Sequence, residues 1–305
     1  MDDDKGKQNQ TRKAYYLQHL KRVVSMIDAK RTSDGAGVAL NRAFTYFTDN
    51  RIDPFLMLDN FNSSNPEEFM AGFPWHPHRG IETVTYVLEG KVEHEDSTGS
   101  KGMINNGGIQ WMTAGSGIIH QEMPKKENRK MNGFQLWVNL PSNHKMTQPR
   151  YRDAISSEIP VVMADDGTKT KIISGKVKNQ DGPINDLKTD TQFMDITVPE
   201  ESSLEFYVKP GYTSLIYIFE GYALFGPEKI RAETGKTVVF DREGENIILA
   251  TGASPARFLL LTGKPLNEPV VWYGPIVMNT ESELIHAFRE YREGTFLKHG
   301  LPDWK

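Results

Sequence analysis

The sequence predicts an all-β protein of two domains, each a β-sandwich or β-barrel, with one short helix near the C-terminus. Short runs rich in β-branched and aromatic residues alternate with Gly, Asn, Asp and Pro turns, a pattern typical of sandwiches and barrels. This texture occurs twice, over about residues 23–140 and 159–265. A chain of 305 residues is long enough for two such domains.

Composition narrows the chemistry that the chain can perform. A net charge of −4 provides no electrostatic attraction to nucleic acid, so we expect no direct nucleic-acid binding. The sequence has no cysteine, which excludes disulfides, iron–sulfur clusters and cysteine nucleophiles and leaves imidazole and carboxylate groups as metal ligands. No apolar run approaches 18 residues, and no apolar signal segment opens the chain. We therefore expect no membrane span and a cytoplasmic location, or a nuclear one in a eukaryote.

The N-terminal part divides into a tail and a first domain. Residues 1–22 are polar and charged, and we interpret them as a frayed tail. A targeting role is the alternative, but the acidic run at residues 2–4 argues against a transit peptide. The first domain is expected over residues 23–140, with strands at 83–88 and 134–140 and turns such as Glu89-Gly90 between them.

Residues 141–158 are polar, contain Pro141 and Pro149, and are interpreted as a linker. The second domain is expected over residues 159–305. Its expected strands lie at 171–174, 193–198, 214–219, 236–240 and 257–261. A helix is expected to open at 279–283 and to close at Gly294. Its apolar residues have helical spacing: Leu284, Ile285, Ala287, Phe288 and Tyr291.

Two short pairs of potential metal ligands stand out in the first domain. They are His76-Pro77-His78 and His120-Gln121-Glu122. Residues i and i+2 of a strand point to the same face, so each pair offers two donor groups side by side, roughly 6–7 Å apart at Cα. Two neighbouring strands with such pairs could surround one ion with four ligands and leave positions open for small molecules.

Three nearby residues have open assignments. Glu82 is a competing carboxylate, although a straight strand would place it about 13 Å from His78, so a bend near Gly80 would be needed. His94 precedes a Ser-Thr-Gly turn and is interpreted as a surface or turn histidine. Arg79 is either a counter-charge in the cavity or the partner of a surface acid.

Longer motifs around these residues resemble the pirin family of the cupin superfamily. The segment from Phe73 to Tyr86, which reads FPWHPHRGIETVTY, is similar to the first cupin metal motif in its pirin variant. The stretches at 94–97 (HEDS), 110–124 (QWMTAGSGIIHQEMP), 263–270 (GKPLNEPV) and 274–280 (GPIVMNT) match further pirin signatures. The resemblance covers about residues 23–295.

The resemblance implies a bicupin whose N-terminal domain binds one divalent transition metal. The implied ligands are His76, His78, His120 and Glu122, so the pirin pattern favours Glu122 over Glu82, which is then expected to be a supporting or structural group. The metal implied is iron, with manganese, cobalt, nickel, copper and zinc as alternatives. The second domain has no matching histidines, and we expect it to cover the first domain, supply a cavity wall or present a partner surface.

Two functions follow from this resemblance. The first is a quercetin 2,3-dioxygenase-type oxidoreductase that opens flavonols with molecular oxygen and releases carbon monoxide. In that reaction Glu122 would accept the substrate hydroxyl proton, and the three histidines would fix the metal's geometry and redox potential. The alternative is an iron-dependent, redox-sensitive regulatory protein that acts through protein partners in transcription. We expect a monomer in either case.

Overall fold

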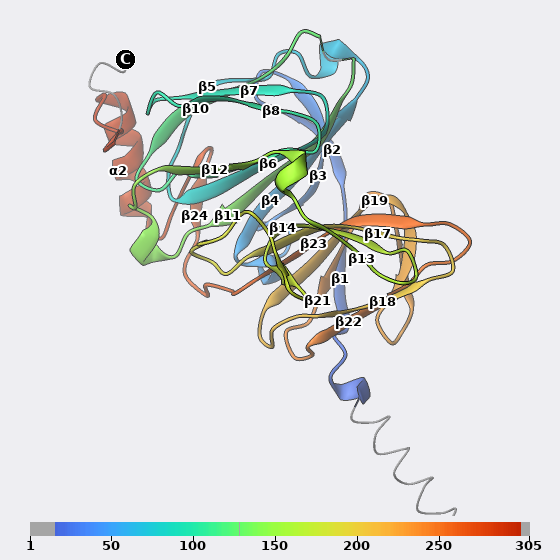
Figure 1. Ribbon diagram of the computed structural model, residues 1–305. Coiled ribbons are helices and arrows are strands. Elements are labelled where there is room, and N and C mark those ends of the chain that lie inside the picture. The colour runs from blue at the N-terminus through green and yellow to red at the C-terminus, as the bar shows by residue number, and fades with distance from the viewer. Residues whose placement is uncertain (1–15, 128, 300–305) are drawn as a thin grey trace, which may run out of the picture.

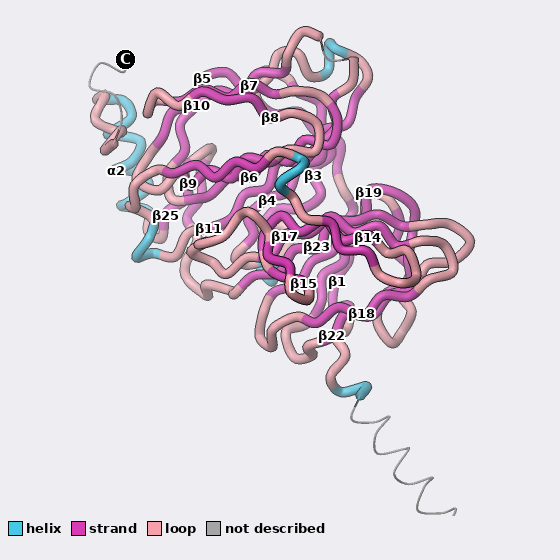
Figure 2. The backbone as a smooth tube through the Cα atoms, viewed as in Figure 1, coloured by secondary structure: helices cyan, strands magenta, loops and turns pink. Residues whose placement is uncertain are grey.

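The computed structural model describes residues 16–127 and 129–299. Two β domains lie one above the other, and a helix flanks the upper, N-terminal one (Figure 1). Strands dominate the backbone trace in Figure 2. The predicted all-β class with a C-terminal helix is confirmed, and the domains are sandwiches rather than closed barrels. In the described ranges, no helix is long and apolar enough to cross a membrane.

The N-terminal domain is a sandwich of a seven-stranded and a four-stranded antiparallel sheet. The larger sheet has the order β12 (Arg150–Ala154), β9 (Ile109–Thr113), β6 (Ile81–Glu89), β11 (Met131–Asn139), β4 (Phe55–Ser63), β3 (Val38–Thr45) and β2 (Lys30–Asp34). The smaller sheet has the order β5 (Phe73–His78), β10 (Ile118–Pro124), β7 (Val92–Asp96) and β8 (Lys101–Ile104).

The C-terminal domain is built on one ten-stranded sheet that folds back on itself. Its main path is β1 (Val23–Asp28), β21 (Lys236–Phe240), β19 (Thr213–Phe225), β23 (Ala256–Gly263), β17 (Gln192–Val198), β14 (Lys169–Ser174) and β13 (Val161–Met163). The other three strands are β18 (Ser203–Tyr207), β22 (Asn246–Ala250) and β20 (Ile230–Glu233). Strands β20 and β22 pair with the far half of β19, and β18 pairs with β22.

The remaining elements are small. Two short hairpins are β15 (Lys176–Val177) with β16 (Gln180–Asp181) and β24 (Val271–Tyr273) with β25 (Ile276–Met278). Single 3-10 turns lie at Asn50–Ile52, Pro66–Glu68, Ser142–His144 and Ser156–Glu158. Helix α2 (Glu281–Arg292) is the predicted C-terminal helix. Thr280 caps its first turn reciprocally with Glu283, and Gly294 follows its end with a φ of 74°, as expected of a helix terminator.

The first strand and the last helix each pack on the domain that is more distant from them in sequence. Strand β1 was expected to open the first domain, but it pairs with β21 in the C-terminal sheet. Conversely, β25 and α2 pack against the N-terminal domain, where Ile119 of β10 joins their apolar cluster. Part of the segment expected as a linker is strand β12, the edge strand paired with β9. The polar sequence of β12 fits an edge position, where one side of a strand is left unpaired.

The two domains share one hydrophobic core. It combines N-terminal residues such as Tyr86, Trp111 and Phe134 with C-terminal residues such as Phe193 and Tyr217. A separate core fills the interior of the C-terminal sandwich with residues such as Ile216, Ile218, Phe225 and Phe258. The N-terminal sandwich encloses a smaller apolar cluster that includes Phe61, Val92 and Met131, together with histidines and a cavity.

Candidate metal centre

The two predicted ligand pairs lie on adjacent strands of the small N-terminal sheet. His76 and His78 are on β5, and His120 and Glu122 are on β10. The antiparallel register places His120 directly opposite His76. Because i and i+2 side chains share a face, both pairs point into the sandwich, as the sequence pattern predicts. The tight turn before β10 depends on Gly115 and Gly117, whose φ angles are 50° and 135°.

Three of the four predicted ligands converge. Ring nitrogens of His76, His78 and His120 all lie within 4.8 Å of one another. His78 and His120 are 2% and 1% exposed. Burial is the main cause that holds their pKa values well below the ordinary range, with neighbouring histidines adding to it. Both rings are therefore neutral, which is the form that binds metal ions.

Hydrogen bonds select the ring nitrogens that face the centre. Nδ1 of His76 lies 2.7 Å from the carbonyl oxygen of Pro74, and Nδ1 of His78 lies 3.1 Å from that of Pro275. A carbonyl only accepts, so each Nδ1 carries a proton, and in a neutral ring Nε2 then has a lone pair. The two Nε2 atoms are 3.0 Å apart. Two facing lone pairs repel each other, and a cation between them removes that conflict.

His120 supports the same conclusion. Both of its ring nitrogens are buried and have no hydrogen-bond partner among the described residues. An unpaired buried nitrogen costs about 1–3 kcal/mol. The three histidines together form a nitrogen donor set that fits a divalent transition metal, without selecting one metal among the candidates.

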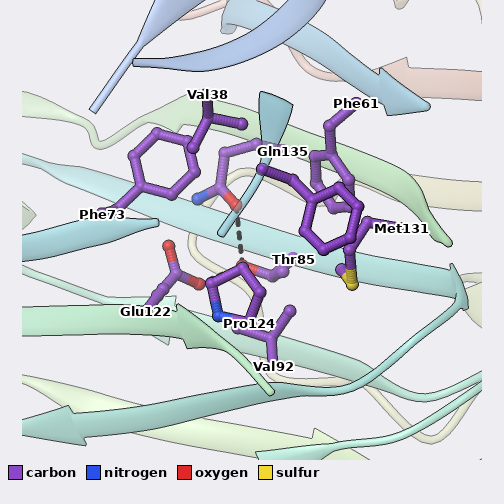
Figure 3. Close-up of a pocket in the computed structure, with 10 residues that line it drawn as sticks. Val38, Phe61, Phe73, Thr85, Val92, Glu122, Pro124, Met131 and Gln135 are labelled. Carbon is purple, nitrogen blue, oxygen red and sulfur yellow. Dashed lines mark hydrogen bonds between the residues drawn. The ribbon is translucent and has the colours of Figure 1, made fainter. Parts of the chain in front are cut away.

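Glu122 faces the same cavity but lies outside the cluster of converging nitrogens. It lines the cavity together with His76 and His78. Its Oε1 accepts a hydrogen bond of 2.6 Å from the Thr85 hydroxyl, which is also 2.7 Å from Oε1 of Gln135. Figure 3 shows the Glu122 carboxylate beside Thr85 at the edge of an apolar pocket. The side chain is 5% exposed, so it has a fixed position from which to serve as a fourth ligand or as a base.

Glu82 lies on the other side of the large sheet. On β6 it alternates with Thr85, which faces Glu122, and points with Val84 toward the core between the domains. Its carboxylate accepts hydrogen bonds from Trp111 Nε1 at 3.0 Å and Thr113 Oγ1 at 2.6 Å. Burial raises the pKa of Glu82, and these hydrogen bonds oppose that effect. The chain makes no bend that brings Glu82 to the histidines.

The interpretation of His94 as a surface or turn residue was wrong. His94 lies on β7, is 1% exposed, and its ring centroid is 5.4 Å from that of His120. Its Nε2 is 3.2 Å from Oδ2 of Asp96, which is fully buried. The Ser-Thr-Gly turn that follows His94 had favoured a surface position. The His94-Glu95-Asp96 alternation, which repeats the i/i+2 spacing of the ligand pairs, was the available signal.

Arg79 supports the histidines from outside the cavity. Its guanidinium is 1% exposed and donates to Glu290 Oε2 of α2 at 2.6 Å and to the carbonyl oxygens of Ser116 and Phe296 at 2.7 Å each. Of the two assignments left open, pairing with an acid is the one observed, but both partners are buried. At Gly80, with φ of 79°, any Cβ would collide with the Val277 carbonyl oxygen. The turn after His78 is thereby fixed against β25.

A cavity of about 740 Å³ opens in front of the cluster. Small-molecule sites commonly measure about 300–1,000 Å³. Its lining includes the C-terminal segment 272–275, so the second part of the chain supplies a cavity wall. Aromatic side chains also line it: Phe47, Trp75, Trp137, Trp272 and Tyr273. The most exposed of these, Phe47 and Tyr273, mark its mouth. Phe47 stacks on Trp272 with 5.1 Å between ring centroids.

Two β-sandwich domains, with a buried histidine triad in the first and an apolar interior in the second, define a bicupin with a single candidate metal centre in the described part of the chain. The family models for "Pirin" and "Pirin C-terminal cupin domain" match residues 37–138 and 193–297. The chain belongs to the pirin family.

Relatives agree with this assignment over nearly the whole chain. A Pseudomonas aeruginosa protein named "Putative quercetin 2,3-dioxygenase" is 42% identical, covering 86% of this chain and 93% of that one. A "Pirin-like protein" of Caulobacter vibrioides is 41% identical, covering 90% and 98%. The crystal structure of a quercetin 2,3-dioxygenase from Acinetobacter baumannii matches with a TM-score of 0.85 at 32% identity, covering 91% and 98%. A bacterial pirin of Escherichia coli in complex with nickel(II) matches at 0.58 and 19% identity, covering 79% and 98%, a likeness of fold.

Proposed function

We propose that this protein is a metal-dependent dioxygenase that opens flavonols such as quercetin with molecular oxygen. The observation that carries the proposal is the set of converging nitrogens of His76, His78 and His120 at the inner end of a ligand-sized cavity. The names of its relatives from Pseudomonas aeruginosa and Acinetobacter baumannii support the choice of reaction.

The cavity suits a flat aromatic substrate. Trp137 and Trp272 lie 5.7 Å apart by ring centroids, and Trp137 also contacts His78 at 4.9 Å. An aromatic wall therefore leads from the mouth to the histidines. Aromatic rings stack on such walls with offset or edge-to-face geometry, so a planar substrate would be oriented toward the cluster.

The chain's own groups divide the chemistry between them. His76, His78 and His120 would hold the metal, and Glu122 either completes the ligand set or accepts the proton of the substrate hydroxyl. Thr85 keeps Glu122 in place through its 2.6 Å hydrogen bond. A bound metal would supply Lewis acidity and, if the ion is redox-active, one-electron exchange. Iron is the expected ion, with manganese, cobalt, nickel, copper and zinc as the alternatives, of which zinc would supply Lewis acidity alone.

Oxygen uptake tests this proposal. Metal-loaded protein is mixed with quercetin, and oxygen consumption and carbon monoxide release are measured. We expect metal-dependent turnover that His76→Ala abolishes together with metal binding. Glu122→Gln should lower turnover by roughly 10²–10⁴-fold if Glu122 is the base.

Two results would contradict the proposal. One is the absence of metal-dependent oxygen uptake with quercetin and with a panel of other flavonols. The other is full turnover by His76→Ala, since that variant lacks one of the three converging nitrogens. If the protein binds metal but turns over no flavonol, the result would favour the alternative function, a redox-sensitive regulatory protein.

A further inference from the structure

A third pair of polar residues lies beside the two ligand pairs. Strand β7 carries His94 and Asp96, and in the antiparallel register Glu122 is opposite His94 while His120 is opposite Asp96. Directly opposite residues project to the same face of a sheet. Strands β5, β10 and β7 therefore present three successive i/i+2 pairs to the sandwich interior, and β10 is the central strand of the three.

Asp96 fixes the protonation of His94. Its Oδ1 accepts hydrogen bonds from the backbone N–H of Thr98 at 2.5 Å and from the Thr98 hydroxyl at 2.6 Å. Both of these contacts are donors to the carboxylate, and a carboxylate oxygen accepts, so Nε2 of His94, 3.2 Å from Oδ2, carries the proton. Nδ1 of His94 then has a lone pair.

His120 has the complementary requirement. A neutral imidazole that binds a metal through one nitrogen carries its proton on the other, which becomes a donor. Nδ1 of His94 and both nitrogens of His120 are buried without hydrogen-bond partners among the described residues. The two rings are 5.4 Å apart by centroid. The metal-free nitrogen of His120 would thus be a donor without an acceptor, and Nδ1 of the neighbouring His94 ring is an acceptor without a donor.

Tyr151 packs against the His94 ring. Its ring centroid is 4.7 Å from that of His94, and its hydroxyl is 3.0 Å from Sδ of Met112. Burial and the Asp96 charge raise the pKa of Tyr151, so the phenol stays protonated. The His94 ring therefore packs against both Tyr151 and His120.

We propose that His94, oriented by Asp96, is a positioning residue that accepts a hydrogen bond from the metal-free nitrogen of His120 once a metal is bound to the other nitrogen. An acceptor on that nitrogen fixes the orientation of a ligating imidazole and increases its donor strength. The Asp96 charge acts on the metal through both rings. This inference rests on the metal centre of the proposed function, but it requires no particular substrate.

The test compares four variants of the full chain. His94→Ala removes the acceptor and Asp96→Asn removes the charge with little change in shape. Glu95→Gln is the matched control, because Glu95 lies between them on β7 and pairs with Gln121 on the opposite face. His76→Ala is the ligand control. Metal content, metal affinity by chelator competition, the visible spectrum of the Co(II) form and the Fe(III)/Fe(II) midpoint potential are measured without substrate.

We expect His94→Ala and Asp96→Asn to bind one metal per chain with about 10–100-fold lower affinity. Weaker donation by His120 destabilises Fe(III) relative to Fe(II), so the midpoint potential should rise, and the Co(II) spectrum should change. Glu95→Gln should match the wild-type protein in all four measurements. If His94→Ala does not fold, Asp96→Asn and His94→Leu, whose side chain cannot accept a hydrogen bond, carry the test.

Three results would overturn the inference. Unchanged affinity, potential and spectrum in Asp96→Asn and in the His94 variant would remove the positioning role. Complete loss of metal from His94→Ala, as in His76→Ala, would make His94 a ligand instead. Failure of the wild-type protein to bind any metal would remove the centre itself. Lack of turnover with flavonols, by contrast, would overturn the proposed function and leave this inference standing.

Discussion

Glu82 and Glu122 show that the face to which a glutamate points decides the role of its carboxylate. Both are buried glutamates close in sequence to the ligand histidines, but they lie on opposite sides of the large sheet. Glu82 accepts hydrogen bonds from Trp111 and Thr113, and Nη1 of Arg152 is 3.8 Å away. Its surroundings are those of a structural anion that balances a buried guanidinium.

We predict that Glu82→Ala destabilises the fold and leaves metal binding intact. The substitution leaves Trp111 Nε1 unpaired and Arg152 without its buried counter-charge, which should lower the free energy of unfolding by about 3–5 kcal/mol. Chemical denaturation measures that loss, and elemental analysis measures the bound metal. Glu122→Ala is the comparison, with a small stability change and impaired turnover. A Glu82→Ala protein that folds as well as wild type but binds no metal would make Glu82 a ligand.

At the scale of elements, the C-terminal hairpin and helix stabilise the turn that presents His78. The Pro275 carbonyl accepts from His78, the Val277 carbonyl contacts Gly80, and Glu290 of α2 pairs with Arg79. Lys145 joins the same turn, donating to the carbonyl oxygens of Gly80 and Val277 at 2.9 and 3.1 Å. The position of His78 therefore depends on elements about 200 residues later in the chain.

We predict that Glu290→Ala loosens α2 and weakens metal binding together. Loss of the carboxylate leaves the Arg79 charge buried, at a cost of about 3–5 kcal/mol. Hydrogen exchange over residues 281–292 should accelerate, and metal affinity should fall because the His78 turn loses its support. Glu293→Ala is the control, because Glu293 is exposed and lies just past the end of α2, and it should change neither quantity. Faster exchange with unaltered metal affinity would show that α2 does not position His78.

For the whole molecule, Asp195 joins the two domains at their shared core. It is 2% exposed and accepts from Arg257 at 2.9 and 2.7 Å within the C-terminal sheet. It also accepts from the hydroxyl of Tyr86 in the N-terminal domain at 2.8 Å. Because β1 and α2 each pack on the other domain, we expect the two domains to unfold together.

We predict that the protein unfolds in a single transition and that Asp195→Ala lowers the free energy of unfolding by about 3–5 kcal/mol. The fluorescence of Trp75, Trp111 and Trp137 follows the first domain, since residues 159–265 contain no tryptophan. Far-UV circular dichroism follows both domains. The two signals should coincide in the wild type and in the variant. Asp181→Ala, which alters an exposed ion pair with Lys176, is the control. Separate transitions in wild-type protein would contradict the coupling.

The sequence predicted what depends on local periodicity. Strand β6, helix α2 with its terminator Gly294, and the i/i+2 placement of His76 with His78 were all expected from spacing along the chain. These features were accessible because a strand alternates its side chains and a helix repeats every 3.6 residues wherever the chain later packs. The same periodicity at His94 and Asp96 was visible, but a turn signal next to it was given more weight.

By itself, then, the sequence determined the all-β class, the C-terminal helix and the residue types available for a metal centre without cysteine. Only the tertiary structure decided which strands are neighbours. In the structure, β1 belongs to the second domain and residues 150–154 form an edge strand. Glu82 points away from the histidines, and His94 is buried beside His120. The physical reason is that pairing between distant strands is fixed by the burial of whole faces, which local spacing does not encode.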